Sequence, residues 1–196
     1  MGAPPMMPDN VLSTEPINAA FSGARALAVT GLIDYEDGGI AIQDPSEGSQ
    51  YQRWRGRLLG SDIILDAPEV EPFSVYSGEG ITEFSFTFDQ NMRPAVAFVQ
   101  DGVAKLWWFD SVPGQQVITE YPGAVTPRVI LDDKRFTQTS NSDVILGYVR
   151  DGALYYRQQR DRFTIERLLD AGPHVGLVKI GFNVQLRLQY LMEIKR

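Results

Sequence analysis

Two pairs of consecutive aromatic residues are the side chains in this sequence best suited to bind a planar ligand. Trp107-Trp108 and Tyr155-Tyr156 each stand within an apolar run. Adjacent residues of a β-strand point to opposite faces, so only one ring of each pair can enter a given core. The other ring could stack on a sugar or a base, or pack against a protein subunit. We favour a core on one side and a subunit interface on the other.

Three arginines follow the second aromatic pair. Arg157, Arg160 and Arg162 lie in the run Arg157-Gln-Gln-Arg-Asp-Arg162, whose long hydrogen-bonding side chains suit a polar interface. A nucleic-acid site is disfavoured because the chain has 25 acidic and 18 basic residues, a formal net charge of −7. We therefore treat these three arginines, with the four aromatic residues, as candidates for an interface or for ligand stacking.

Residues for other chemistry are scarce. The chain has no cysteine and one histidine, His174, with no nucleophile motif near it, so a serine–histidine–acid set is a remote interpretation. Asp132-Asp133 and Asp143 could bind a hard cation with loop carbonyls, although acidic turn residues of this kind more often satisfy backbone donors. We expect no catalytic, metal-binding or cofactor-binding residues, and no enzyme activity.

The elements that carry the aromatic pairs form a tandem repeat. Phe98-Val99 and Asp101-Gly102 in the first copy match Tyr148-Val149 and Asp151-Gly152 in the second, at an offset of 50 residues. Asp-Gly between apolar, aromatic runs is a strong signal for a two-residue β-hairpin turn. The sequence therefore predicts a duplicated hairpin.

Each hairpin is flanked by two more strand-like runs. Residues 81–89 precede and 116–121 follow the first hairpin; 128–132 precede and 163–168 follow the second. Four short antiparallel strands per repeat, at a period near 50, resemble propeller blades. A propeller needs about 4–8 blades, so two cannot close a ring. We expect an all-β fold of antiparallel sheets with two tandem blade-like repeats, with a sandwich or open barrel as the alternative, or several chains completing a ring.

The flanks of the repeat define four regions. We expect an extended, Pro-rich arm over 1–24, an N-terminal β region over 25–76, the repeat over 77–172 and a long C-terminal strand or ribbon over 173–196. The arm is either a loose tail or a segment that lies along a neighbouring subunit. Helix is scarce, and 18–28 is the one modest candidate.

A further hairpin is predicted over 50–68, with Gly60-Ser61 as a two-residue turn. Its first strand places three arginines on one face, which could bind phosphates or an acidic partner. Pairing with nearby acids is the favoured interpretation. The arginines are Arg53, Arg55 and Arg57, and the acids are Asp66, Glu69 and Glu71.

The C-terminus alternates strictly between apolar and mostly polar residues from Val178 to Ile194. This period of two predicts β-structure with one buried face. Because strands are typically ~5–6 residues long, the run indicates a long ribbon or two strands with a bend near Gly181. A long exposed edge would also need a partner to cover it.

Targeting signals are not apparent in the sequence. The N-terminal residues lack the basic and apolar regions of a signal peptide, and no run approaches the ~18 apolar residues of a spanning helix. We expect synthesis in the cytoplasm and no membrane insertion.

The repeat contains four notable segments: Phe88-Asp-Gln-Asn91 with Arg93-Pro94, Leu131-Asp-Asp-Lys-Arg135, Ser142-Asp143 and the run from Leu154 to Phe163. Together these segments resemble a family of virion structural proteins encoded in the tail modules of tailed bacteriophages. The resemblance spans about 80–169, under half of the chain. It implies a non-enzymatic virion component in several copies around the tail axis, and no catalytic residues.

On this basis the expected function is a tail or baseplate structural subunit. Its partners would be copies of itself and other phage tail proteins, without nucleic acid, and it would reside in the virion after synthesis in the host cytoplasm. The alternative is a carbohydrate-recognising, receptor-binding module that stacks host surface glycan on its aromatic rings. A glycan-cleaving propeller is disfavoured because the chain is short and lacks the Asp-box of bacterial sialidases.

Overall fold

The structure is a computed structural model that describes residues 39–43, 51–67, 70–89, 91, 93–132, 143–182 and 188–193. Of 39–43, 51–53 and 182 it describes the backbone alone. The expected arm over 1–24 and the helix candidate over 18–28 lie outside the described residues. Every regular element described is a β-strand except one 3₁₀ turn, so the predicted all-β class is confirmed.

Sheet 1 is an antiparallel meander of four strands in chain order, β1 to β4. The strands are β1 (Gly39–Gln43), β2 (Tyr51–Leu59), β3 (Asp62–Ala67) and β4 (Val70–Ser77). Leu59 pairs with Asp62 across the predicted two-residue turn, and Gly60 has a φ of 63°. Glycine adopts this left-handed backbone without the steric cost of a side chain.

Sheets 2 and 3 are the two predicted repeats, each a four-stranded antiparallel meander. Sheet 2 contains β5 (Ile81–Phe88), β6 (Pro94–Gln100), β7 (Val103–Asp110) and β8 (Gln115–Tyr121). Sheet 3 contains β9 (Val125–Leu131), β10 (Val144–Arg150), β11 (Ala153–Gln158) and β12 (Arg167–Asp170), with the 3₁₀ turn η1 (Gln159–Asp161) between the last two. The tandem blade-like arrangement is therefore confirmed.

The two Asp-Gly turns have the geometry that their sequence predicts. Asp101 and Asp151 both have φ of 51°, and Gly102 and Gly152 have φ of 77° and 79°. Positive φ at both central residues marks a type I′ turn, whose twist matches that of the strands it joins.

The last strand of sheet 3 lies later than expected. The run 163–168 was predicted as a strand, but β12 covers Arg167–Asp170. Arg162 and Phe163 have φ of 52° and 55°, a left-handed backbone that a strand does not have. Phe163 instead inserts its ring against Trp108, with centroids 4.8 Å apart in an edge-on arrangement.

The C-terminal alternation forms two strands rather than one continuous strand. β13 (Gly176–Phe182) and β14 (Leu188–Glu193) pair antiparallel as the C-terminal hairpin, and β13 ends one residue after Gly181, which agrees with the expectation of two strands that separate near this glycine. A register shift between Leu177 and Lys179 changes the phase of the first strand. Leu177 is consequently buried with Ile180, whereas the alternation had assigned Val178 to the buried face.

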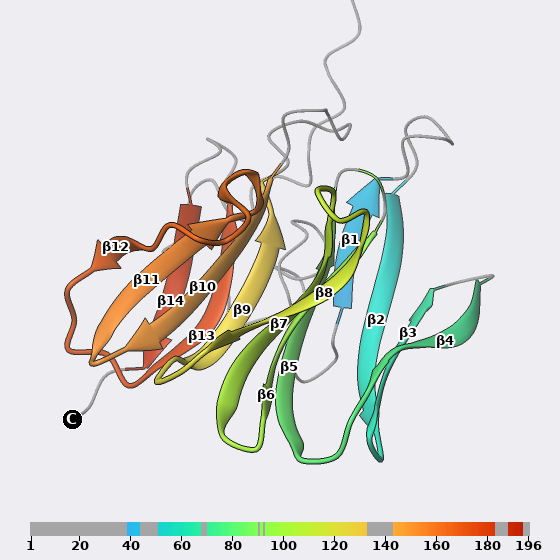
Figure 1. Ribbon diagram of the computed structural model, residues 1–196, viewed down its shortest axis with the longest axis horizontal. Helices are drawn as coiled ribbons and strands as arrows, with labels where there is room; N and C mark the ends of the chain where they lie inside the picture. Colours follow the sequence, from blue (N-terminus) through green and yellow to red (C-terminus); the bar gives the residue numbers. More distant parts are fainter. Residues whose placement is uncertain are drawn as a thin grey trace, which may run out of the picture.

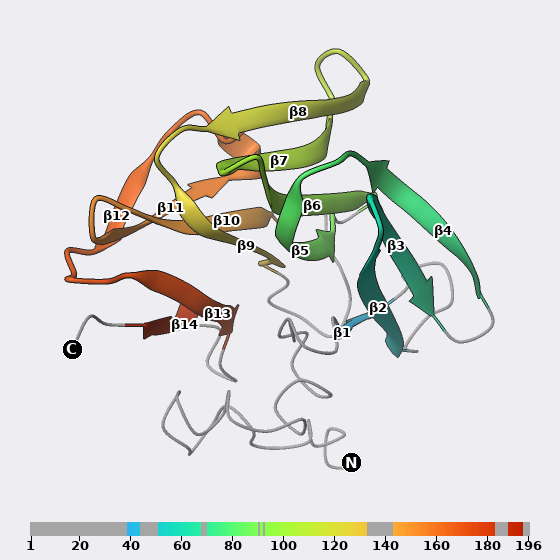
Figure 2. The same ribbon diagram turned by 90° about the horizontal axis from the view of Figure 1, so that it is seen from below.

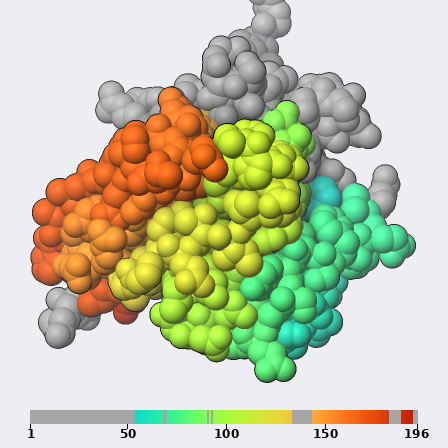
Figure 3. All heavy atoms as spheres, viewed as in Figure 1, coloured from blue at the N-terminus to red at the C-terminus, as the bar shows by residue number. Residues whose placement is uncertain are grey.

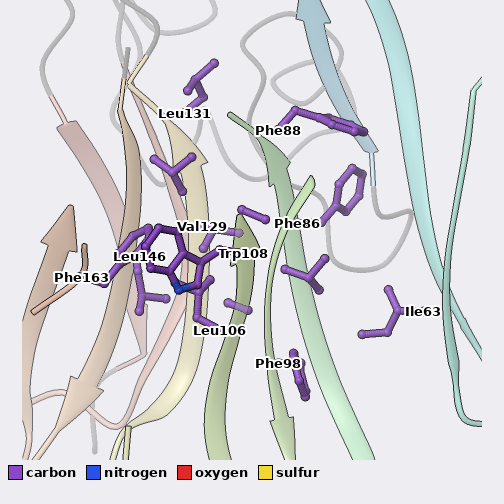
Figure 4. Packing of buried hydrophobic residues seen from close by; sticks show 14 of the residues in the cluster. Ile63, Phe86, Phe88, Phe98, Leu106, Trp108, Val129, Leu131, Leu146 and Phe163 are labelled. Atoms are coloured by element: carbon purple, nitrogen blue, oxygen red, sulfur yellow. The ribbon is translucent and has the colours of Figure 1, made fainter. Parts of the chain in front are cut away.

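The three sheets stack face to face, with sheet 2 in the middle (Figure 1). The face of sheet 2 toward sheet 1 carries Phe86 and Phe98, and the opposite face packs Leu106 and Trp108 against sheet 3. Figure 4 shows both sets of side chains, with Ile63 beyond Phe86 and Phe163 beyond Trp108. One hydrophobic cluster thus joins all three sheets, and Figure 3 shows their colours in the same order across the surface.

The C-terminal hairpin covers the other face of sheet 3 (Figure 2). Its cluster is separate and smaller: Ile130, Ile145, Val149 and Leu154 of sheet 3 are buried with Leu177 and Ile180 of the hairpin. Both faces of sheet 3 are therefore covered by the chain itself, which explains the run of buried residues along β10.

Candidate functional site

The first aromatic pair is divided between the two faces of β7, as its alternation predicts. Trp108 is 3% exposed and donates its indole N–H to Thr119 Oγ1 at 3.2 Å, so it belongs to the core. Trp107 lies on the opposite face, half-buried and directly across from Ile118 of the edge strand β8. Ile118 is 46% exposed. Trp107 also packs against the cluster shared by the three sheets, so of this pair only the part of the Trp107 ring that stays exposed is placed to meet a ligand or a partner.

The second pair is divided in the same way, and both of its rings also contact the chain's own clusters. Tyr155 packs against the cluster shared by the three sheets, where its ring stacks on Tyr148 with centroids 6.3 Å apart. Tyr156 packs against the cluster beneath the C-terminal hairpin. Both residues remain half-buried, so they leave less exposed ring surface for an interface with another subunit than the sequence suggests.

Arg157 lies in a cluster of polar side chains between sheets 2 and 3, here called the Arg157 cluster and comprising Tyr148, Arg150, Arg157 and Glu166. Arg157 Nε donates to Tyr148 Oη at 2.7 Å, and its terminal nitrogens donate to Glu166 and to the carbonyls of Phe163 and Thr164. Tyr148 and Arg150 also donate to Glu166. Arg157 thereby holds the loop that leads into β12.

The Arg157 cluster is suited to stabilising the fold rather than to transferring protons. Burial raises the pKa of Tyr148 to about 12, with opposing effects from Arg157 and Glu166, so its hydroxyl stays protonated at neutral pH. Tyr121 of β8 stacks on Tyr148 at 5.7 Å, and burial raises its pKa as well. Two arginines share one carboxylate, an arrangement that joins β10 and β11 of sheet 3 to the loop before β12 and has its hydrogen bonds satisfied internally.

Arg160 and Arg162 are each paired with a buried carboxylate. The backbone N–H and Nε of Arg160 donate to the two carboxylate oxygens of Asp143, at 2.8 and 2.6 Å. Asp143 also accepts the N–H of Asp132 on its carbonyl at 2.7 Å. These bonds support the interpretation of the acids as turn residues; Asp133 lies outside the described residues. Within the described part of the chain, no three potential ligands come together in a metal site.

Arg162 connects the two repeats. Its Nη2 donates to Asp110 Oδ2 at 2.5 Å, across 52 residues of sequence. The hydrogen bond from Arg162 is the main cause that holds the pKa of Asp110 below its usual value of 3.8. Asp110 Oδ1 also accepts from the N–H of Val112 at 3.0 Å, which fixes the turn between β7 and β8.

Sequence reasoning missed a second set of hydrogen bonds between sheets, which connect the first strands of successive sheets. Ser85 Oγ on β5 accepts the N–H of Val129 on β9 at 2.9 Å, and Thr126 Oγ1 on β9 accepts the N–H of Leu177 on β13 at 2.7 Å. Arg128 donates from Nη1 to Glu83 Oε2 at 2.7 Å and from Nε to the Val178 carbonyl at 3.1 Å.

The repeat alignment contains a signal for Arg128. Ser85 pairs with Ala97 and Arg128 pairs with Gly147, and Ala97 and Gly147 correspond at the offset of 50. Ser85 and Arg128 therefore occupy the same position of the repeat, and each bonds to the first strand of the next sheet. Burial lowers the pKa of Arg128 to about 9, a sign that its charge is costly to hold there.

The remaining candidates are held by local partners. Arg57 Nη2 lies 2.9 Å from Asp66 Oδ2, so the predicted pairing is confirmed for this arginine. Of the other residues in that prediction, the side chain of Arg53 and the whole of Glu69 lie outside the described residues. His174 Nε2 lies 3.3 Å from Asp170 Oδ2, which also accepts from Tyr190 at 3.2 Å.

Several large apolar side chains are exposed near the edge strands. Leu168 of β12 is 58% exposed, and Ile165 and Val112 are also exposed near the Asp110–Arg162 pair.

No helix in the described part is long and apolar enough to cross a membrane. No protein-family model, curated protein or solved structure matches the chain.

Proposed function

We propose that the chain is a non-enzymatic structural subunit of a bacteriophage tail or baseplate, assembling with copies of itself and with other tail proteins. The observation that carries this proposal is the use of the polar side chains. Arg157, Arg160 and Arg162 all bond to acids or carbonyls that join strands and loops. They stiffen the stack of sheets and leave its surface for contact with neighbours.

The exposed apolar residues supply that contact surface. Ile118 lies on the edge strand β8 and Leu168 on the edge strand β12, and Ile165 precedes the latter. Exposed apolar side chains beside open sheet edges are characteristic of protein–protein contacts. The resemblance of 80–169 to phage tail proteins indicates what kind of assembly this surface serves.

The mass of the purified chain in solution, measured by light scattering, tests the proposal. We expect an oligomer, and we expect Ile118→Glu with Leu168→Glu to give monomers with an unchanged circular dichroism spectrum, because charge at the contact opposes assembly. Exposed Val112→Glu is the matched control beyond the two edge strands. A wild-type chain that stays monomeric at tens of micromolar contradicts self-assembly.

Location in the particle needs its own measurement. Antibodies against the chain should label the tails of purified phage particles in electron micrographs. Labelling of no tail structure would contradict the tail assignment even if the chain forms oligomers.

A carbohydrate-recognising module remains the alternative, and the half-buried ring of Trp107 beside Ile118 is the observation that favours it. Stacking of a sugar on this ring would change the tryptophan fluorescence when host surface polysaccharide is added. The change should disappear in Trp107→Ala and persist in Tyr156→Phe, which keeps its ring. A monomeric chain that shows this pattern would favour the alternative over the structural subunit.

A further inference from the structure

The outer strands of the three stacked sheets differ in how their free edges are protected. An edge strand has backbone N–H and C=O groups without a neighbouring strand, and folded proteins protect such an edge with proline, charge, a bulge or short length. The outer strands here are β4, β8 and β12, each last in the order of its sheet. An edge without these features can accept a further strand.

Two of the three edges carry protecting features. β4 contains Pro72, which has no N–H to donate, and its pairing with β3 shifts register twice. β12 has four residues, of which Arg167 and Asp170 are charged, and its pairing with β11 also shifts register. Neither edge therefore offers a regular row of backbone groups to another strand.

The edge of β8 lacks this protection. All seven residues of β8 pair with β7 without a register shift, none is a proline, and the one charged residue is Glu120. Figure 2 shows β8 as the outermost strand of sheet 2, and no described strand pairs with its far side. Its backbone is therefore suited to pair with an extended polypeptide segment.

The exposed side chains of β8 indicate what such a segment would carry. Ile118 is 46% exposed, and the Glu120 side chain is 57% exposed and lies 3.1 Å from Lys105 of β7. Residues directly opposite on neighbouring antiparallel strands have Cβ atoms about 4.5–5.5 Å apart, and opposite charges in these positions attract. The segment would therefore place an apolar residue beside Ile118 and a basic residue beside Glu120, two positions apart.

We propose that the free edge of β8 binds an extended segment of another tail protein, which adds to sheet 2 as a fifth strand. Backbone hydrogen bonds supply the affinity, and the residues opposite Ile118 and Glu120 supply the specificity. This rests on the proposed function and deepens it by naming one contact with a partner. Leu168 on β12 is left for contact between copies.

A synthetic peptide, Thr-Lys-Thr-Val-Thr-Lys-Thr with blocked ends, is the probe. It is as long as β8, and its symmetry places valine opposite Ile118 and a lysine opposite Glu120 in either direction. Amide hydrogen exchange of the dilute chain is measured by mass spectrometry with and without peptide. We expect about tenfold slower exchange in β8 and no change in β4 or β12. No slowing in β8 at about millimolar peptide overturns the proposal.

Backbone methylation of the peptide separates strand pairing from side-chain contact. One form is N-methylated on the lysines and the valine, and the other on the two central threonines, because alternate N–H groups of a strand point to opposite edges. We expect one form to bind like the parent peptide and the other to lose binding. Equal binding of both forms would mean that the backbone is not used, and strand addition would be wrong.

Substitutions in the chain test the two side chains, with circular dichroism to verify folding. Ile118→Lys should weaken peptide binding about tenfold because charge protects an edge, whereas Leu168→Lys on β12 is the matched control and should leave it unchanged. Glu120→Lys should lose the parent peptide and bind a peptide with glutamate in place of lysine. Equal binding of that peptide by wild type and Glu120→Lys would overturn the basic residue assigned to the partner.

Light scattering separates this inference from the proposed function. If the chain forms oligomers and its β8 amides become protected as the concentration rises without peptide, a second copy occupies the edge. The added strand from another protein is then wrong, while the proposed function stands. A monomeric chain that binds the peptide in the expected way supports strand addition, although self-assembly fails.

Discussion

At the scale of single residues, the arginines differ in how much of the fold depends on them. Arg157 is 15% exposed in its side chain and donates to Tyr148, Glu166 and two loop carbonyls. Arg57 is 56% exposed and pairs with Asp66 alone among the described contacts. Removing one member of a buried polar network lowers the free energy of unfolding more than removing one member of an exposed ion pair does.

We predict that Arg157→Met lowers the free energy of unfolding by about 2–3 kcal/mol, because it removes one of the donors to the partly buried Glu166 carboxylate and leaves the Phe163 and Thr164 carbonyls without the guanidinium that they accept from. Arg57→Ala should lower it by less than about 1 kcal/mol. Urea unfolding followed by tryptophan fluorescence measures both. Equal losses for the two variants would show that the Arg157 cluster is not a structural joint.

At the scale of elements, the Asp-Gly turn between β6 and β7 of sheet 2 allows the substitution of its glycine to be compared with that of its aspartate. Gly102 has φ of 77° and nothing within 4 Å of a Cβ built on it. We predict that Gly102→Ala costs about 1 kcal/mol through backbone strain alone. Asp101→Asn should be neutral, since asparagine also accepts the type I′ conformation. Thermal unfolding measures both, and an unchanged midpoint for Gly102→Ala would contradict the turn assignment.

The elements were predictable where the signal is local. Alternation and the Asp-Gly pairs indicate the hairpins of sheets 2 and 3, because turn chemistry and the period of side chains act over a few residues. The same reasoning fails at Phe163, where packing against Trp108 overrides strand propensity. It also fails at Val178, where a register shift exchanges the buried and exposed faces.

For the candidate site, the sequence predicted which residues are of interest but not which partners they bond to. Sequence identifies Arg157 and Arg162 as polar side chains of interest but gives no information on their partners. Glu166 reaches Arg157 across a loop, and Asp110 reaches Arg162 from another sheet. Such pairs depend on how sheets stack, which no local pattern encodes. Arg128 could have been found by aligning the first strands of the two repeats.

At the scale of the whole molecule, the stack depends on polar joints between sheets as well as on its core. The Asp110–Arg162 pair joins sheet 2 to the segment that leads into β12 of sheet 3. Because its pKa is lowered in the folded protein, Asp110 contributes stability above about pH 4, where the unfolded carboxylate is ionised. That contribution is lost as the pH falls through the lowered pKa of the folded state.

We therefore predict that Asp110→Asn is less stable than the wild type at pH 7, and that the difference shrinks as the pH falls below 4. Protonation gives the wild type a neutral side chain in the acid range, as the substitution does at every pH, so the two proteins converge. Urea midpoints measured from pH 7 to pH 2.5 test this. Asp101→Asn, in an exposed turn on the same sheet, is the control. A difference that stays constant over this range would mean that the charge of Asp110 does not help hold the two sheets together.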